Sequence, residues 1–268
     1  MKFALVNDIR AEPSPGNRGI CCYCGVSTTS RCGPKRVWHW AHLPNKHCDP
    51  WWESETLWHR KWKGYFLERN QEVIHFDSLT GEKHIADIKT DRGLVIELQN
   101  SPIKSTELHS RENFYENMVW IVNGEKFKDN FHILDPLPDP RAEFAQDIVF
   151  SRRCADWQGR VFWRLSENPD YIFGSSELVR LHSMSEIENQ IKEAYIGHHL
   201  FDWKHPRTVW YESNKPVYLD FNSNELLVQV KIYRLYGDHH PLWCVQYVSK
   251  KYIIETAGGI YTSIVNTG

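Results

Sequence analysis

Two carboxylates on neighbouring apolar runs are the strongest candidates for chemistry in this sequence. The segment HIADIKTDRGLVIELQNS, residues 84–101, places Asp87 in one run and Glu97 in the next. A three-residue loop between the runs keeps the apolar positions on one face, and it puts Gly93 where such a loop needs a left-handed residue. Asp87 then lies directly opposite Glu97 on the other face of a β-hairpin.

This pairing of like charges predicts that a proton or a cation lies between the two acids. Opposed residues have Cβ atoms about 5 Å apart, and two charges at that distance repel by about 3 kcal/mol at an effective dielectric of 20. Mg²⁺ is held by one or two carboxylates, with water and phosphate at its other positions, as a phosphodiesterase requires. Gln99 lies on the same face as Glu97. The alternative is that these residues only form the solvated face of a hairpin.

A third acidic side chain precedes the hairpin. The segment WWESETLWHRKWKGYF, residues 51–66, has helical spacing, and its aromatic residues share one arc. A glutamate in the middle of an aromatic face is costly to bury without a partner, which favours a side chain aimed at Asp87 and Glu97. The alternative is a salt-bridged helix edge. The polar residues on or beside this arc are Glu55, His59 and Lys63.

Further elements are predicted on both sides of the hairpin. Residues 72–77 (EVIHFD) and 118–123 (MVWIVN) have the composition of strands, and a helix is expected from Ser105 onward. That helix carries Arg111 and Tyr115 near one side. The predicted order is therefore helix, three strands, helix, strand.

Five of the seven cysteines lie between Cys21 and Cys48, and such clustering favours metal binding over disulfides. A tetrahedral zinc site would use Cys21, Cys24, His39 and His42. The two-residue gap between the histidines is shorter than usual, so Cys32, His47 and Cys48 stay open as alternative ligands. A reduced, partly buried cysteine cluster is the other interpretation.

The length and charge of the chain limit the other predictions. Its 268 residues are enough for one large or two modest domains. The formal net charge of −2 means that nucleic acid must be contacted through a local patch, such as the basic cluster in residues 31–69. The sequence has no signal-peptide pattern and no run of membrane-spanning length, so a cytoplasmic protein without membrane contact is expected.

The proline-rich stretch DPLPDPR, residues 135–141, is expected to interrupt regular structure. We therefore predict an N-terminal zinc-binding module (1–50), a core (51–134) and a C-terminal α+β domain (142–268). In that domain a helix is expected at 185–198 and a strand at 226–236, with 242–248 as its antiparallel partner. Substrate recognition, dimerisation and binding of a protein partner all stay open for this domain.

The combination of motifs resembles the competence protein CoiA-like family, over roughly residues 1–125. The matching pieces are the Cys-x-x-Cys at 21–24, HWAH at 39–42, ETLWH at 55–59 with Lys63, HIAD ending at Asp87, IELQNS at 96–101, and Arg111 with Tyr115. The resemblance implies an α/β (α+β) fold with a PD-(D/E)xK restriction-endonuclease-like core after a small zinc-finger-like module.

The resemblance also implies residue roles. Asp87 and Glu97 would hold Mg²⁺ or Mn²⁺, Glu55 would be the helix acid, and Gln99 would stand where the family has a lysine. An amide can only orient by hydrogen bonds, so Lys63 or Lys89 would have to supply the positive charge. The expected substrate-binding residues are His59, Arg111 and Tyr115.

The leading hypothesis is a Mg²⁺-dependent endodeoxyribonuclease, an endonuclease or nickase that hydrolyses DNA phosphodiester bonds during the processing of incoming or foreign DNA. One alternative is a nucleic-acid-binding or assembly factor that has a nuclease-like fold without activity. Another is an endonuclease that acts on RNA. Cleavage that depends on a divalent ion separates the first two.

Overall fold

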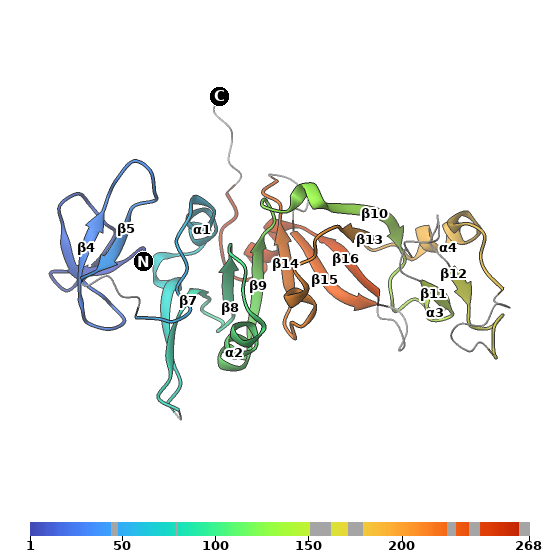
Figure 1. Cartoon of the computed structure of the whole chain (residues 1–268), viewed down its shortest axis with the longest axis horizontal. Helices are drawn as coiled ribbons and strands as arrows, with labels where there is room; N and C mark the ends of the chain where they lie inside the picture. The colour runs from blue at the N-terminus through green and yellow to red at the C-terminus, as the bar shows by residue number, and fades with distance from the viewer. Residues whose placement is uncertain are drawn as a thin grey trace.

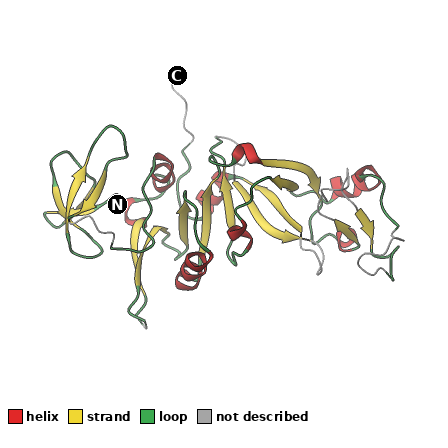
Figure 2. Cartoon of the chain, viewed as in Figure 1, coloured by secondary structure: helices red, strands yellow, loops and turns green. Residues whose placement is uncertain are grey.

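The computed structural model shows a mixed α/β protein with several sheets and few helices (Figures 1 and 2). It describes residues 1–43, 48–78, 80–150, 162–170, 179–223, 229–235 and 242–262. Within these residues, no helix has both the length and the apolar character needed to cross a membrane.

The N-terminal residues form a small antiparallel sheet of five short strands in the order β2-β1-β3-β4-β5. It lies at one end of the molecule in Figure 1. Its strands are β1 (Ala4–Val6), β2 (Ile9–Ala11), β3 (Arg18–Ile20), β4 (Ser27–Arg31) and β5 (His39–His42).

A nine-stranded sheet in the order β10-β13-β16-β15-β14-β9-β8-β7-β6 forms the centre of the molecule. The pairs β8–β9 and β9–β14 are parallel and the other pairs are antiparallel. The strands are β6 (Gln71–Phe76), β7 (Lys83–Lys89), β8 (Val95–Gln99), β9 (Met118–Asn123), β10 (Phe131–Leu137), β13 (His198–Trp203), β14 (Val217–Asp220), β15 (Gln229–Leu235) and β16 (Leu242–Val248).

Helices cover both faces of this sheet (Figure 1). The helix α2 (Ser105–Tyr115) buries Leu108 and Tyr115 in one apolar cluster, whereas α1 (Leu57–Lys63) and α5 (Lys250–Thr256) pack in another with Ile88 and Ile96. The remaining elements are α3 (Glu143–Gln146), α4 (Glu188–Glu193), the pair β11 (Ile148–Phe150) and β12 (Phe162–Arg164), and 3₁₀ turns at Glu68–Asn70, Lys128–Asn130, Met184–Ile187 and Thr208–Tyr211.

The predicted order of helix, three strands, helix and strand is confirmed by α1, β6, β7, β8, α2 and β9. The first helix is shorter than expected, because it begins at Leu57 rather than near Trp51. The Thr56 side chain accepts the backbone N–H of His59, and the His59 ring accepts the backbone N–H of Thr56. This capping box fixes the start of the helix at the N-cap Thr56, so Glu55 lies just before it.

The C-terminal half contributes strands to the same sheet. The expected interruption at 135–141 begins later than predicted, because β10 continues through Pro136 to Leu137 with a register shift and pairs with β13, whereas residues 138–141 form no helix or strand. Proline is tolerated in a strand at such an irregularity. The antiparallel pairing of β15 with β16 is confirmed, although residues 226–228 and 236 of the expected strand lie outside the described residues. The helix expected at 185–198 is limited to α4 and the preceding 3₁₀ turn.

Candidate carboxylate site and metal-binding cluster

The β7–β8 hairpin has the predicted register. Ile88 pairs with Ile96 and Lys89 with Val95, which requires a three-residue loop between Thr90 and Leu94. Gly93 has φ +80° in this loop, a conformation that glycine adopts without a Cβ clash.

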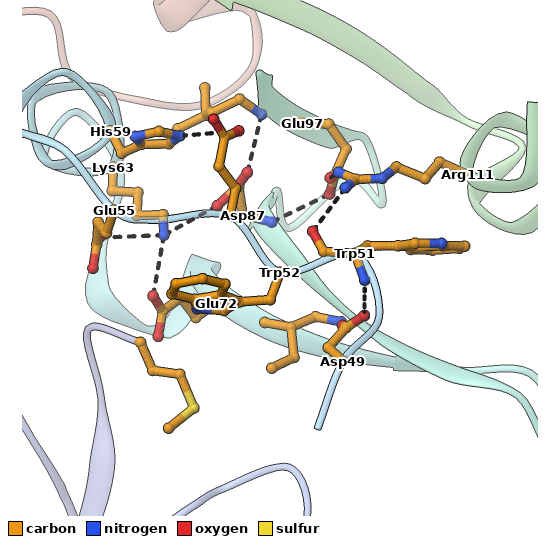
Figure 3. A pocket seen from close by; sticks show the side chains of 14 residues that line it. Asp49, Trp51, Trp52, Glu55, His59, Lys63, Glu72, Asp87, Glu97 and Arg111 are labelled. Carbon is orange, nitrogen blue, oxygen red and sulfur yellow. Dashed lines mark hydrogen bonds and ion pairs between the residues drawn. The ribbon is translucent and has the colours of Figure 1, made fainter. Parts of the chain in front are cut away.

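The two carboxylates replace part of the backbone ladder between the strands. The backbone N–H of Asp87 donates to Glu97 Oε1 at 3.3 Å, and the N–H of Leu98 donates to Asp87 Oδ2 at 3.0 Å. Each acid therefore accepts a hydrogen bond from the opposite strand. These bonds fix the two side chains side by side (Figure 3).

Lys63 supplies a positive charge at this position. Its Nζ lies 3.0 Å from Asp87 Oδ1, 3.1 Å from Glu72 Oε1 and 3.3 Å from Glu55 Oε1, and the side chain is buried. Burial lowers the pKa of Lys63, but the three carboxylates raise it more. The ammonium therefore stays charged and offsets the repulsion among the acids (Figure 3).

Arg111 from α2 holds the second acid. Its Nη1 donates to Glu97 Oε2 at 2.9 Å, and its Nη2 donates to the Trp51 carbonyl at 2.7 Å and to Glu107. Burial and the nearby Asp87 charge raise the pKa of Glu97, Arg111 opposes them, and the result is about 7. Glu97 can therefore change its protonation near neutral pH.

Glu72 is a site residue that the sequence analysis missed. It lies on β6, where the pairing of Val73 with Ala86 and of Gln71 with Ile88 places it opposite Asp87. Burial raises the pKa of Glu72, but Lys63 and the backbone N–H of Lys2 outweigh burial and bring it to about 2. The loop between β6 and β7 is long, so the sequence alone gave no register for this strand.

These side chains line a small cavity of about 70 Å³. Two further acids reach it from the segment before α1. Glu53 Oε2 accepts the backbone N–H of Asn100 at 3.1 Å and lies 3.8 Å from the His59 ring. The cavity is lined by Met1, Asp49, Trp51, Trp52, Glu53, Glu55, His59, Lys63, Glu72, Ile85, Asp87, Glu97, Leu98 and Arg111.

Two carboxylate oxygens of this cavity have no hydrogen-bond partner in the part of the chain that the structure describes. Among the described residues, Glu53 Oε1 and Glu55 Oε2 are buried without a hydrogen-bond partner, which is costly for an acceptor in the interior. Carboxylate oxygens are the ligands that Mg²⁺ and Mn²⁺ prefer. Asp87 and Glu97 are the two acids whose positions are fixed from both strands.

Three of the expected site residues lie elsewhere. Lys89 Nζ lies 3.0 Å from the His75 ring and does not line the cavity. Gln99 is buried and donates to the Ser101 carbonyl, and Tyr115 is buried beside Trp51 in the α2 cluster. All three lie on the predicted elements, but none of them lines the cavity.

A group of sulfur and nitrogen ligands lies beside the small N-terminal sheet. Cys21, Cys24, His42 and Cys48 offer ligand atoms that all lie within 4.8 Å of one another. This group could bind a metal such as zinc, whose structural sites use four cysteine and histidine ligands. Burial and the neighbouring thiols raise the pKa of Cys48, and a bound cation would reverse this effect.

The expected ligand set is therefore corrected at one position. His39 does not belong to the group, because its Nδ1 faces the Val37 carbonyl at 2.9 Å. Cys48, one of the open alternatives, takes the fourth place. Cys32 lies outside the group, and His47 lies outside the described residues.

The metal-binding group connects directly to the carboxylate cavity. Asp49 follows Cys48 and accepts the backbone N–H groups of Ile85 and Trp51, at 2.8 and 3.0 Å. Trp51 in turn stacks on His84 with ring centroids 3.3 Å apart. The segment that ends the small module is thus bonded to β7 beside the acids.

No protein-family model, curated protein or solved structure matches this chain. The functional argument therefore depends on the geometry of the site.

Proposed function

We propose that this chain is a divalent-metal-dependent nuclease that hydrolyses phosphodiester bonds of DNA. The observation that carries the proposal is the pair of half-buried Asp87 and buried Glu97, fixed across two strands in a small cavity with further acids and one lysine. The core would then be of the PD-(D/E)xK type, and the resemblance to the CoiA-like family remains part of this proposal.

In this proposal Asp87 and Glu97 hold Mg²⁺ or Mn²⁺, which when bound stabilises developing negative charge and lowers the pKa of a water nucleophile. Lys63 takes the role of the nuclease lysine, because it lines the cavity while Gln99 and Lys89 do not. Arg111 positions Glu97 through its hydrogen bond. Zinc at the cysteine–histidine group has a structural role.

One observation favours a second candidate. Lys63 and Arg111 already neutralise Asp87 and Glu97 through contacts of 3.0 and 2.9 Å. These contacts offset the charges of the two acids without a metal. The second candidate is therefore a nucleic-acid-binding or assembly factor without activity.

Cleavage of supercoiled, linear and single-stranded DNA, with an RNA control, tests the proposal. Each substrate is incubated with EDTA, Mg²⁺ or Mn²⁺. Asp87→Ala should abolish cutting, whereas Asp91→Ala should leave it unchanged, because Asp91 lies exposed on the same hairpin and pairs with Arg69. Binding without cutting by the unaltered protein in all conditions would favour the second candidate.

A further inference from the structure

A second, larger cavity adjoins the carboxylate cavity. Its volume is about 250 Å³, and it lies between the small N-terminal sheet and β7. The two cavities share Met1, Asp49, Trp52 and Ile85 as lining residues. Figure 3 shows Trp52 and Asp49 on one side of the carboxylate cavity. A bound molecule can therefore extend from one cavity into the other.

The carboxylate cavity is too small for a nucleotide. Its volume of about 70 Å³ is far below the roughly 300 Å³ at which pockets for small organic ligands begin. Only an ion with part of a phosphate group fits there. The Asp87 side chain is 23% exposed and the Glu97 side chain 3%. A phosphate of a nucleic acid must therefore enter the recess, away from the surface of a duplex, to reach them. Enzymes that act on a base extrude the target nucleotide into a recessed pocket, and an unpaired strand can likewise enter a recess that a rigid duplex cannot.

The lining of the second cavity suits an unpaired nucleotide. Trp52 is 39% exposed and offers a surface on which a base can stack. Arg36 is exposed, and His39 lines the same cavity, so positive charge is available for a phosphate. The acid in this lining is Asp49, whose oxygens already accept from Ile85, Trp51 and the His84 ring.

We propose that the second cavity binds the nucleotide next to the scissile phosphate, and that the substrate is therefore a single-stranded or locally unpaired polynucleotide. Trp52 stacks on the base and Arg36 contacts the adjoining phosphate. The inference rests on the proposed function for the identity of the reacting group. The binding surface can be measured separately from cleavage.

Fluorescence anisotropy with labelled (dT)12, (U)12 and a 12-base-pair duplex tests the binding. The measurements use the full chain in Ca²⁺, which prefers the same oxygen ligands, over a range of salt concentrations. Trp52→Leu should weaken binding of the single strands by at least about five-fold without changing the salt dependence. Arg36→Ala should also reduce the slope of log K against log salt by about 0.7. Arg31→Ala is the matched control, because Arg31 is exposed on β4 and lies outside the cavity lining.

The outcomes separate this inference from the proposed function. Tight binding of single strands that falls in both cavity variants supports the inference even if no metal produces cleavage. Metal-dependent cutting of intact duplex at the rate for single strands, with no effect of Trp52→Leu or Arg36→Ala, would overturn the inference and leave the nuclease proposal intact. A difference between (dT)12 and (U)12 shows which of the two single-stranded probes, the DNA or the RNA, the cavity prefers. Failure to bind any of the three probes would also refute the inference. Circular dichroism of each variant checks that it is folded.

Discussion

Replacing Lys63 with methionine is expected to destabilise the protein strongly and to make its stability dependent on divalent ions. Lys63 Nζ lies within 3.3 Å of oxygens from Glu55, Glu72 and Asp87, and its side chain is 4% exposed. Methionine fills a similar volume without charge. The variant therefore leaves three acids close together without their shared partner.

The expected loss of unfolding free energy is about 3–5 kcal/mol at pH 7.5, the range for removing one partner of a buried ion pair. Protonation of an acid would limit the loss. The pH dependence has a definite sign, since the folded-state pKa of Glu72, about 2, lies below its ordinary value of 4.5. Its stabilising contribution is complete above pH 4.5 and is lost as the pH falls toward 2. The difference in unfolding free energy between the wild type and Lys63→Met should therefore narrow as the pH falls from 4.5 toward 2.

Urea denaturation of the wild type, Lys63→Met and Lys61→Met measures these effects. Lys61 is the control because it lies on the same helix and, within the part of the chain that the structure describes, donates to the neutral Asn222 side chain. Mn²⁺ at 100 times its dissociation constant should restore about 2.7 kcal/mol to Lys63→Met, since the ion can replace the lost charge. A stability of Lys63→Met within 1 kcal/mol of the control would refute the role of the ammonium. Absence of any stabilisation of Lys63→Met by Mn²⁺ would refute the ion site.

Three further predictions follow from the geometry. Because folding raises the pKa of Glu97 from 4.5 to about 7, the free energy of unfolding should fall by up to about 3 kcal/mol as the pH rises from 4.5 to 7. Glu97→Gln should remove this fall when the free energy of unfolding in urea is measured against pH. The affinity of the wild type for Mn²⁺ should increase up to about pH 7. Cys48→Ser should lower the zinc content measured in the purified protein, whereas His39→Ala should leave it unchanged. Asp220→Asn should reduce the free energy of unfolding by about 3–5 kcal/mol in urea, because it leaves the buried Lys250 ammonium without its partner; an effect below 1 kcal/mol would contradict that interpretation.

The parts of the site that could be predicted from sequence are those set by local rules. The position of Gly93 and the alternation of apolar residues determine the hairpin register, so Asp87 and Glu97 could be placed opposite each other. The helical spacing of Trp58, Trp62 and Phe66 identified the buried side of α1, and Lys63 beside this arc is the residue of the helix that reaches Asp87.

The parts that could not be predicted depend on contacts between distant segments. Glu72 joins the acids only because β6 pairs with β7 across a long loop, and its φ of +46° is unusual for a glutamate. Cys48 replaces His39 as a ligand because the chain returns to the small sheet after β5. The signal for Cys48 was its position among the clustered cysteines, and spacing alone did not rank it above His39.

The C-terminal half takes part in positioning the site, although it contributes no residue to the carboxylate cavity. Asp220, at the end of β14, is buried and its Oδ2 accepts hydrogen bonds from the indole N–H groups of Trp58 and Trp62, at 2.9 and 2.7 Å. Lys250 from α5 donates to the same oxygen at 2.9 Å. Since Lys63 follows Trp62 directly, this network fixes the helix that carries the central ammonium. The strand β14 also pairs in parallel with β9, which in turn pairs with β8 beneath Glu97. The acids and the lysine are therefore held from two sides by residues more than 100 positions further along the chain, and the segment that carries them depends on the C-terminal half for its geometry.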